Sequence, residues 1–454
     1  MITRRRILAS SILTGLSSLM PNGILASAAD EKSSQIPWRN WSGALISHPR
    51  ARLAPASEDE LISMLKQSTG TIRPVGSGHS FTPLVPTDGN LLILDKLNGV
   101  VSHDEQSMEA TLWAGTRLSD SGLQLDVIGQ AMINLPDIDR QTIAGAISTS
   151  THGTGKGLKS LSGYLTGLRL VTPAGDVMEL DGDKDSDLFD AARVSFGSLG
   201  IITQARFLNR APFRLRSRTW VEETESVLEK FDESIETYEH YEMMPICHSK
   251  YSLVIAHQET TDPITATSEA DDGGEFLVLL DSTPVALRGA LVDSLVGTIE
   301  PTEFVSKSFD GLTNLRFDRF NEMEYSVPVE AGPQCLREIL SIIEQESIDV
   351  VIPLEYRIIE GDDCWLSMFS GGPRVSISVH RLAGHDYRPY FDIVEPIFWK
   401  YGGRPHWGKV HSLSSKELKK LYPRFDDFVR LQTSIDPEGR MLNDHLRHLL
   451  GRYL

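Results

Sequence analysis

A glycine-rich loop is the first stretch whose residue types could hold a ligand. Residues 73–82 read RPVGSGHSFT. Gly76 and Gly78 let the backbone turn tightly and approach a bound molecule, and successive N–H groups in such a loop can bind an anion. No Lys precedes a Ser or Thr, so this is not a Walker loop. His79 would reach along a ligand, although the loop taken alone is better explained as an ordinary glycine-rich turn.

A second stretch combines small residues with hydroxyls. Residues 141–157 read QTIAGAISTSTHGTGKG. Ala144, Gly145 and Ala146 would allow close packing against a flat ligand. The alternative is a Ser/Thr-rich surface loop, but the flanking segments are apolar. Five hydroxyls could bind a phosphate or a ring edge: Ser148, Thr149, Ser150, Thr151 and Thr154.

Ionisable residues with useful spacing occur late in the chain. Glu355 and Arg357 are two apart, so on a strand they share one face and can converge on one ligand. His380 and Lys409 are further candidates. Taken alone, a Glu-x-Arg pair is more often a solvated ion pair, and a lone histidine is more often a core residue.

Three ordered motifs together resemble the vanillyl-alcohol oxidase-type flavoproteins, in the branch of the aldonolactone oxidases, such as D-arabinono-1,4-lactone oxidase, and the alditol oxidases. These motifs are the loop at residues 73–81, the I-A-G-A…T-H-G-T-G segment at residues 143–155, and H-W-G-K at residues 406–409. The resemblance implies a two-subdomain FAD-binding domain and a substrate domain. It also implies FAD linked covalently through His79.

The same resemblance implies roles for individual residues. Glu355, Arg357, His380 and Lys409 would form the catalytic centre. His380 would take the hydroxyl proton of the substrate, Arg357 would hold the substrate or stabilise charge, and Lys409 would stabilise the reduced flavin. The cofactor would contact Pro74, Val75, Gly76, Ser77, Gly78, His79, Ser80, Asp137, Thr142, Gly145, Thr149, Ser150, Thr151, His152 and Ile202.

Three positions depart from the family pattern. Pro136 stands where family oxidases commonly carry a small residue beside the flavin, which predicts slow reaction with oxygen and another electron acceptor. The alternative is that Pro136 only stiffens the turn. Leu382 and Asp137 replace hydroxyl residues of the alditol-oxidising relatives, which favours a sugar lactone as substrate. An acidic Asp137 would repel a carboxylate substrate.

The first 29 residues predict a twin-arginine signal peptide, with T-R-R-R-I-L at residues 3–8, a mildly apolar stretch and A-S-A at residues 26–28. The apolar stretch is interrupted by polar residues and is too short for a membrane anchor. We therefore expect export to the periplasm or beyond, without stable membrane insertion.

The composition excludes several classes of protein. The formal net charge of −18 becomes −21 without the three arginines of the leader, so the surface would repel nucleic acid. Cys247, Cys335 and Cys364 allow at most one internal disulfide, and no cluster of ligands has the spacing of a metal site. The expected partners are a small sugar lactone or polyol, and oxygen or an electron-acceptor protein.

The elements around the motifs predict an α+β protein. Ser57 to Glu60 predicts a helix start, residues 71–75 a strand that leads into the glycine loop, and residues 164–171 and 176–180 a hairpin. No G-x-G-x-x-G opens a helix, so this is not a Rossmann unit. The predicted domains are an FAD-binding domain at residues 37–210, a mixed-sheet substrate (cap) domain at residues 211–400, and a C-terminal segment at residues 401–454 that packs back on the FAD domain. In the substrate domain we expect strands at residues 249–256, 276–280 and 375–379, with helices at residues 227–238 and 335–346.

The resulting prediction is FAD-dependent oxidation of a secondary alcohol of a sugar lactone or polyol. Three alternatives remain: an alditol oxidase, a flavoprotein that oxidises an aromatic alcohol, and a periplasmic sugar-binding protein without catalysis. The binding protein would be colourless and would not need His79 after a Gly-x-Gly turn.

Overall fold

The computed structural model describes residues 36–265, 274–314 and 318–453. The predicted signal peptide lies outside these residues and stays a prediction. No helix in the described ranges is both long enough and apolar enough to cross a membrane.

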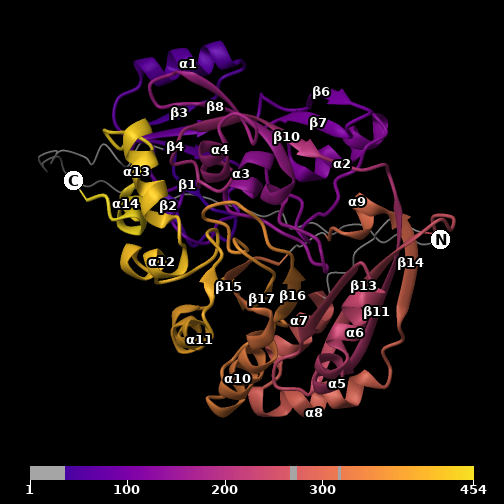
Figure 1. Cartoon of the computed structure of the whole chain (residues 1–454). Coiled ribbons are helices and arrows are strands. Elements are labelled where there is room, and N and C mark those ends of the chain that lie inside the picture. Colours follow the sequence, from indigo (N-terminus) through magenta and orange to yellow (C-terminus); the bar gives the residue numbers. More distant parts are fainter. Residues whose placement is uncertain (1–35, 266–273, 315–317, 454) are drawn as a thin grey trace, which may run out of the picture. The chain divides into compact units, whose positions relative to one another are not determined.

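Residues 36–210 form two main sheets, which Figure 1 shows in indigo to magenta. A three-stranded parallel sheet has the order β3-β5-β4, and a five-stranded antiparallel sheet has the order β6-β7-β10-β8-β9. The predicted hairpin is the pair β8 and β9. The strands are β1 (Trp38–Arg39), β2 (Ile46–Ser47), β3 (Ala51–Leu53), β4 (Ile72–Val75), β5 (Asn90–Ile93), β6 (Val100–Asp104), β7 (Glu109–Trp113), β8 (Leu165–Val171), β9 (Val177–Asp181) and β10 (Ile201–Leu208).

Short helices accompany these sheets. The first helix begins as the sequence predicts, because the Ser57 hydroxyl accepts from the Glu60 amide and the Glu60 carboxylate accepts from the Ala56 amide. Its apolar face buries Leu61 and Leu65. The helices are α1 (Glu58–Gln67), α2 (Leu118–Val127), α3 (Ile143–Ser148), η2 (Leu161–Tyr164) and α4 (Ser186–Ala192).

Residues 211–405 build one eight-stranded sheet in the order β14-β11-β13-β12-β16-β17-β15-β18. All its strand pairs are antiparallel, so the predicted mixed sheet is wrong in strand direction. The strands are β11 (Arg214–Glu223), β12 (His240–Pro245), β13 (Tyr251–Thr260), β14 (Thr302–Lys307), β15 (Phe320–Pro328), β16 (Glu355–Ile359), β17 (Arg374–Leu382) and β18 (Arg404–Pro405).

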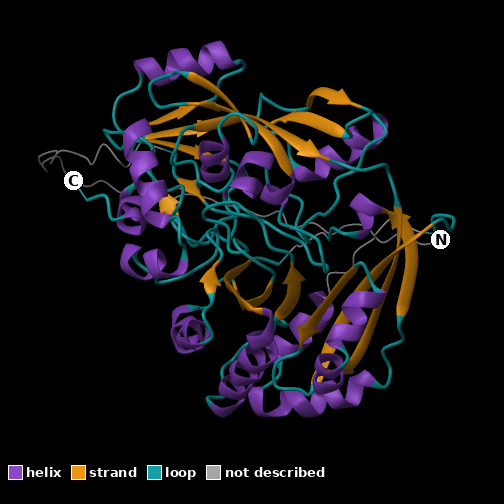
Figure 2. Ribbon diagram, in the orientation of Figure 1, coloured by secondary structure: helices purple, strands orange, loops and turns teal. Residues whose placement is uncertain are grey.

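Helices cover one face of this sheet, and Figure 2 shows them beside its strands. Ring contacts join the layers: Phe231 lies 5.0 Å from Tyr356 and Phe398 lies 4.8 Å from Tyr325, centroid to centroid. The opposite face of the sheet remains free to line a site. The helices of this region are α5 (Thr224–Glu229), α6 (Phe231–Thr237), α7 (Gly274–Ser282), α8 (Val285–Val296), α9 (Ser308–Gly311), η3 (Val329–Ala331), α10 (Gly332–Gln345) and α11 (Arg388–Lys400). Helix α7 is an exception to the covered face, because its Phe276 and Leu277 contribute to a cavity on the opposite face.

One predicted strand is a helix. Residues 276–280 read FLVLL and lie inside α7. A short apolar run has no period that separates a buried strand from a helix, so its tertiary surroundings decide. The other predicted elements are present, although the helix predicted at residues 227–238 is divided into α5 and α6.

Three C-terminal helices follow: α12 (Ser415–Leu421), α13 (Phe425–Ile435) and α14 (Asp444–Leu450). The Asn443 amide donates to the carbonyls of Pro83 and Pro86 at 2.9 Å, and Arg440 donates to the Leu65 carbonyl at 2.8 Å. These bonds hold the last segment against residues of the N-terminal sheets. All three cysteines are buried and free.

Two buried histidines of the eight-stranded sheet predict acid sensitivity. Burial lowers the pKa of His240 to about 4 and that of His257 to about 3. Below the unfolded value of about 6.5, the unfolded chain binds protons that the folded chain does not, so stability falls as the pH drops from 6.5 towards 4. We expect each histidine to lower the free energy of unfolding by on the order of 2 kcal/mol between neutral pH and pH 4.5.

Chemical denaturation at pH 7, 6 and 5 measures this loss. The variants His240→Gln and His257→Gln should weaken the dependence of the unfolding free energy on pH, whereas the exposed control His103→Gln should not. If the unfolding free energy depends on pH equally in wild type and in all variants, these two histidines are not the cause of the acid sensitivity.

Candidate active site

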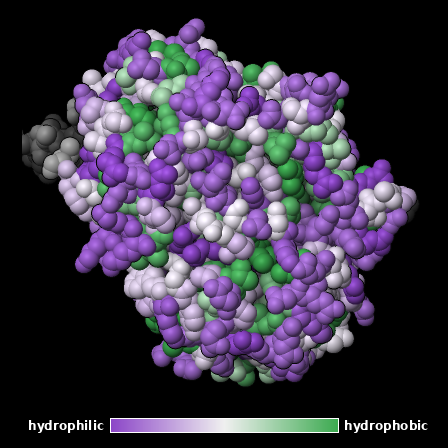
Figure 3. Space-filling model, viewed as in Figure 1, coloured by the Kyte–Doolittle hydropathy of each residue, from purple (hydrophilic) through white to green (hydrophobic). Residues whose placement is uncertain are grey.

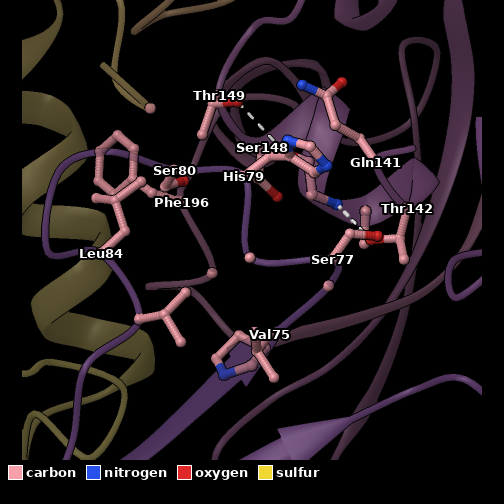
Figure 4. A pocket seen from close by; sticks show the side chains of 18 of the residues that line it. Val75, Ser77, His79, Ser80, Leu84, Gln141, Thr142, Ser148, Thr149 and Phe196 are labelled. Carbon is pink, nitrogen blue, oxygen red and sulfur yellow. Dashed lines mark hydrogen bonds between the residues drawn. The ribbon is translucent and has the colours of Figure 1, made fainter. Parts of the chain in front are cut away.

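A cleft runs between the glycine loop, α3 and the turn before β10. Figure 4 shows His79, Ser148 and Thr149 around it. The Thr142 hydroxyl accepts from the Gly145 amide and caps α3. Of the predicted cofactor residues, the cleft is lined by Pro74, Val75, Gly76, Ser77, Gly78, His79, Ser80, Thr142, Gly145, Thr149 and Ile202.

Glycine is required in this cleft by close packing. A Cβ atom on Gly76 would lie 2.2 Å from the Thr142 hydroxyl oxygen, and one on Gly197 would lie 2.6 Å from the Pro74 ring. Any side chain at these positions would displace the cap of α3 or the end of β4. The backbone therefore forms the wall of the cleft, as the binding of a long, flat, phosphate-bearing cofactor requires.

Arg73 ties the walls of the cleft together from behind. Its fully buried guanidinium donates to the carbonyls of Leu84 and Gly197 at 2.9 Å and of Phe196 at 2.7 Å, and also to that of Met441. These carbonyls belong to three separate segments of the chain. The sequence marks Arg73 only as the start of the motif, and its structural role depends on contacts more than 100 residues away.

His79 lies partly buried at the cleft. Its ring stacks on Trp41 with centroids 5.0 Å apart. Burial, aided by the charge of Lys409, lowers the pKa of His79 to about 4. The imidazole is therefore neutral near pH 7 and has a nitrogen lone pair for bond formation.

A second, larger cavity of about 910 Å³ lies against the free face of the eight-stranded sheet. All four predicted catalytic residues line it: Glu355, Arg357, His380 and Lys409. Asp137, Thr151 and His152, which were predicted to bind the cofactor, also line this cavity and not the cleft. Ser150 lines neither, and its hydroxyl lies 3.0 Å from that of Ser367.

Strand register brings the polar residues together. In β15 and β17, Glu322 lies opposite His380 and Glu324 opposite Ser378, while in β16 Glu355 lies opposite Ser378. Residues opposite each other in an antiparallel pair share a face. Glu322 and Glu324 were not predicted as site residues. They are two residues apart in F-N-E-M-E-Y, a spacing that places both side chains on one face of a strand.

Ion pairs organise the centre of the site. Arg357 Nη2 lies 2.6 Å from Glu355 Oε2 and 3.8 Å from Glu324 Oε1, and Lys409 Nζ is hydrogen-bonded to Glu322. Burial alone would raise the pKa of Glu322, but the charge of Lys409 outweighs burial and lowers this pKa. Burial opposes the charge of Arg357, but Glu355 and the other carboxylates raise its pKa, so it stays cationic.

His380 is arranged to accept a proton. Its Nδ1 lies 3.2 Å from the Pro353 carbonyl, which can only accept, so Nδ1 carries the proton. In the neutral ring, Nε2 then has the free lone pair. Nε2 lies 3.6 Å from Glu322 and 4.0 Å from Glu355, too far for a hydrogen bond with either carboxylate.

The cleft and the cavity meet at three residues that line both: Gln141, His406 and Lys409. His406 was part of the predicted motif but had no assigned role. Its Nδ1 accepts from the Gly408 amide at 2.9 Å, and burial lowers its pKa to about 3, so its proton lies on Nε2. At this junction a ligand in the cleft would lie next to a ligand in the cavity.

Two carboxylate–histidine groups lie close enough to share a cation, with potential ligand atoms within 4.8 Å of one another. These are His152, Glu324 and His406, and Glu322, Glu355 and His380. The carboxylates already pair with Lys409, Arg357 or His152, which lies 2.6 Å from Glu324. We therefore assign both groups to the positioning of charge and protons.

The family model for D-arabinono-1,4-lactone oxidase matches residues 205–449, more than half of the chain. The chain belongs to this family. The model for an FAD-binding domain matches residues 49–181, which contain the glycine loop and α3. As a member of the D-arabinono-1,4-lactone oxidase family, the protein is an FAD-dependent oxidoreductase that acts on CH–OH groups.

Whole-chain comparisons agree with this assignment. The L-gulono-1,4-lactone dehydrogenase of Mycobacterium tuberculosis is 32% identical over 426 residues, which cover 91% of this chain and 99% of the relative. The L-gulonolactone oxidase of Mus musculus is 28% identical over 430 residues, which cover 90% of this chain and 97% of the relative. A crystal structure of cholesterol oxidase from Brevibacterium sterolicum has the same fold, with a TM-score of 0.76, 14% identity and coverage of 91% of this chain and 96% of that chain.

Proposed function

We propose that the protein oxidises a secondary alcohol of an aldonolactone, with FAD in the cleft and the lactone at the polar face of β15, β16 and β17. Bound FAD would supply the acceptor for the hydride of the carbinol carbon. The observation that carries the proposal is the free Nε2 of His380, in the cavity that Lys409 and His406 connect to the cleft. His380 would take the hydroxyl proton as the C–H bond breaks.

Arg357 would orient the lactone. Its Nε is buried without a hydrogen-bond partner among the described residues, and the residue lines the cavity. A lactone carbonyl or hydroxyl oxygen could accept this bond. The ion pair with Glu355 fixes the guanidinium, so little conformational entropy is lost on binding.

Charge in the cavity favours a lactone over its open-chain acid. The lining contains the carboxylates of Asp137, Asp318, Glu322, Glu324 and Glu355 against the cations of Arg357 and Lys409. A carboxylate substrate would be repelled, whereas a neutral lactone would not. Leu382 packs beside the apolar cluster of Ile246, Leu280 and Val351 and does not line the cavity.

A substrate screen with an artificial dye as acceptor tests the proposal. L-Gulono-, L-galactono- and D-arabinono-1,4-lactones should turn over faster than alditols, simple alcohols and the corresponding aldonates. A preference for alditols would support an alditol oxidase instead, and purified protein without flavin would point to a sugar-binding protein.

We further propose that the flavin is attached to His79, because this ring is neutral and lies at the cleft. Acid-precipitated wild-type protein should stay yellow, whereas His79→Ala should release its flavin into the supernatant. The exposed His103 provides a matched control, because His103→Ala should behave as wild type. Free flavin in the wild-type supernatant would exclude the covalent bond but not the binding of FAD.

Pro136 is expected to restrict the access of oxygen. It is buried and lines the cavity next to Asp137. Its fixed φ limits how far the backbone can yield, so the reduced enzyme should react slowly with oxygen and faster with a dye. Stopped-flow reoxidation should become several-fold faster in Pro136→Gly. If wild type already reacts rapidly and the variant is no faster, Pro136 is not a gate.

A further inference from the structure

The cavity has an apolar half that the oxidation of a lactone does not use. The free face of the sheet changes character between β16 and β12. Towards β14 it carries mainly apolar side chains, with Thr219 and Thr302 as polar exceptions. Strand register places the apolar ones on one face: Val221 lies opposite Leu253, and Leu253 lies opposite Met244. We call this region the apolar chamber; it is lined by Val221, Met244, Leu253, Ile255, Phe276 and Phe304.

The apolar chamber is not filled by its own side chains. Leu253 and Ile255 are partly exposed, whereas Val254, on the other face of the same strand, is fully buried. Ligand pockets have volumes of about 300–1000 Å³, and this cavity reaches about 910 Å³. A sugar lactone has the size of a monosaccharide, so it would occupy the polar half and leave the apolar surface in contact with water.

The outer rim of the apolar chamber is also apolar. Helix α7 directs Phe276 and Leu277 to the cavity, while Val278 is 68% exposed and Leu279 is 41% exposed. On α8, Leu287 is 56% exposed. Figure 3 shows hydrophobic surface near the middle of the lower half of the molecule, where α7 lies in Figure 1. Apolar residues gathered at the mouth of a pocket favour a ligand that arrives from a hydrophobic phase.

We propose that the apolar chamber binds a lipophilic quinone, which accepts the electrons taken from the lactone. The proposal rests on the proposed function, because a polar lactone leaves the apolar half for the second substrate. The quinone ring would lie at the polar end, where Lys409 and Arg357 can donate to its carbonyl oxygens, and the hydrocarbon tail would lie along Val221, Leu253 and Ile255. Gln141, His406 and Lys409 line both the cleft and this cavity, so the ring would lie beside the cofactor.

The reaction balances in atoms and electrons. Oxidation of the alcohol to a ketone releases a hydride to FAD and a proton to His380. The quinone takes up two electrons and two protons to become a quinol, which returns the cofactor to its oxidised form. The two substrates would use the polar end in turn, since the product must leave before the quinone ring enters.

A series of quinones that differ only in tail length tests the proposal on the holoenzyme. Equilibrium dialysis measures binding to the oxidised protein, and anaerobic stopped-flow measures reoxidation of the reduced protein. Decylubiquinone should bind at least roughly tenfold more tightly than the tail-less ubiquinone-0, the gain expected from burying about two methylene groups. Reoxidation should show the same order.

The variant Leu253→Asn/Ile255→Asn makes the apolar chamber polar at similar side-chain volume. In this variant decylubiquinone should bind no more tightly than ubiquinone-0. The matched control is Leu208→Asn, because Leu208 is 41% exposed on β10, away from the cavity. If the double variant fails to fold, the tail-length series on wild type still decides. Equal affinity for both quinones would overturn the proposal.

Two controls separate this proposal from the proposed function. When the flavin is reduced with dithionite, its reoxidation by the quinone can be measured without any lactone. Failure of lactones to reduce the flavin would then count only against the proposed function. If long-chain alcohols reduce the flavin at rates that rise with chain length, and the double variant removes that rise, the apolar chamber holds the body of an alcohol substrate and the quinone proposal is wrong.

Discussion

Replacing Lys409 by methionine is expected to slow reduction of the flavin by substrate about 10³-fold while FAD stays bound. Lys409 provides a cation at the junction of the cleft and the cavity. The loss of one preorganised group of this kind commonly costs about 10²–10³ in rate. The variant also leaves Glu322, which is 3% exposed, without its nearest cation. An unpaired carboxylate beside the cofactor opposes the negative charge that the flavin gains on reduction.

A double variant separates these two effects. In Lys409→Met/Glu322→Gln the unpaired charge is removed, so roughly tenfold of the lost rate should return. The flavin midpoint potential should fall in the single variant and recover in part in the double variant. Lys400→Met is the control, because Lys400 also pairs with a glutamate but lies on the surface. Unchanged reduction kinetics in the single variant would remove Lys409 from the mechanism.

The second large effect is expected at His380. The variant His380→Ala should lower kcat/KM about 10³-fold, because general base catalysis contributes about 10²–10⁴ in rate. The ring is held by its bond to the Pro353 carbonyl and by an edge contact with Phe320, whose centroid lies 5.2 Å away. These contacts direct Nε2 to the cavity without consuming its lone pair.

Chemical rescue distinguishes proton transfer from a packing role. Added imidazole should restore part of the activity of His380→Ala, because a small base can occupy the vacated space. A variant that had only lost packing would not respond. The control His385→Ala removes an exposed histidine five residues later and should retain wild-type activity. Full activity of His380→Ala would assign the proton to another group.

Features that depend on a few neighbouring residues could be predicted from the sequence. The capping pattern at Ser57 fixed the start of α1, because a cap depends on residues three positions apart. The glycine loop could be recognised because the Thr142 hydroxyl leaves no room for a side chain at position 76, so only glycine fits there. The spacing of Glu355 and Arg357 gave a shared strand face, and the structure places both at one cavity.

Local patterns were insufficient where the surroundings decided the outcome. The run at residues 276–280 became part of α7 because five apolar residues carry no distinguishing period. The strand directions of the eight-stranded sheet depend on how its connections run, and no short motif encodes them. The apolar chamber was not foreseen, because its residues come from β11, β12, β13, β14 and α7, each of which reads as ordinary core.

The sequence by itself therefore determined the family and the cofactor, because these depend on motifs with fixed spacing. Only the tertiary structure decided which groups meet. The register of β15 against β17 set Glu322 opposite His380, and the return of the H-W-G-K segment along β15 brought Lys409 to Glu322. The contact between Lys409 and Glu322 joins residues 87 positions apart, and that between His152 and Glu324 joins residues 172 positions apart. They arise from strand pairing and burial across the whole chain, which no local pattern records.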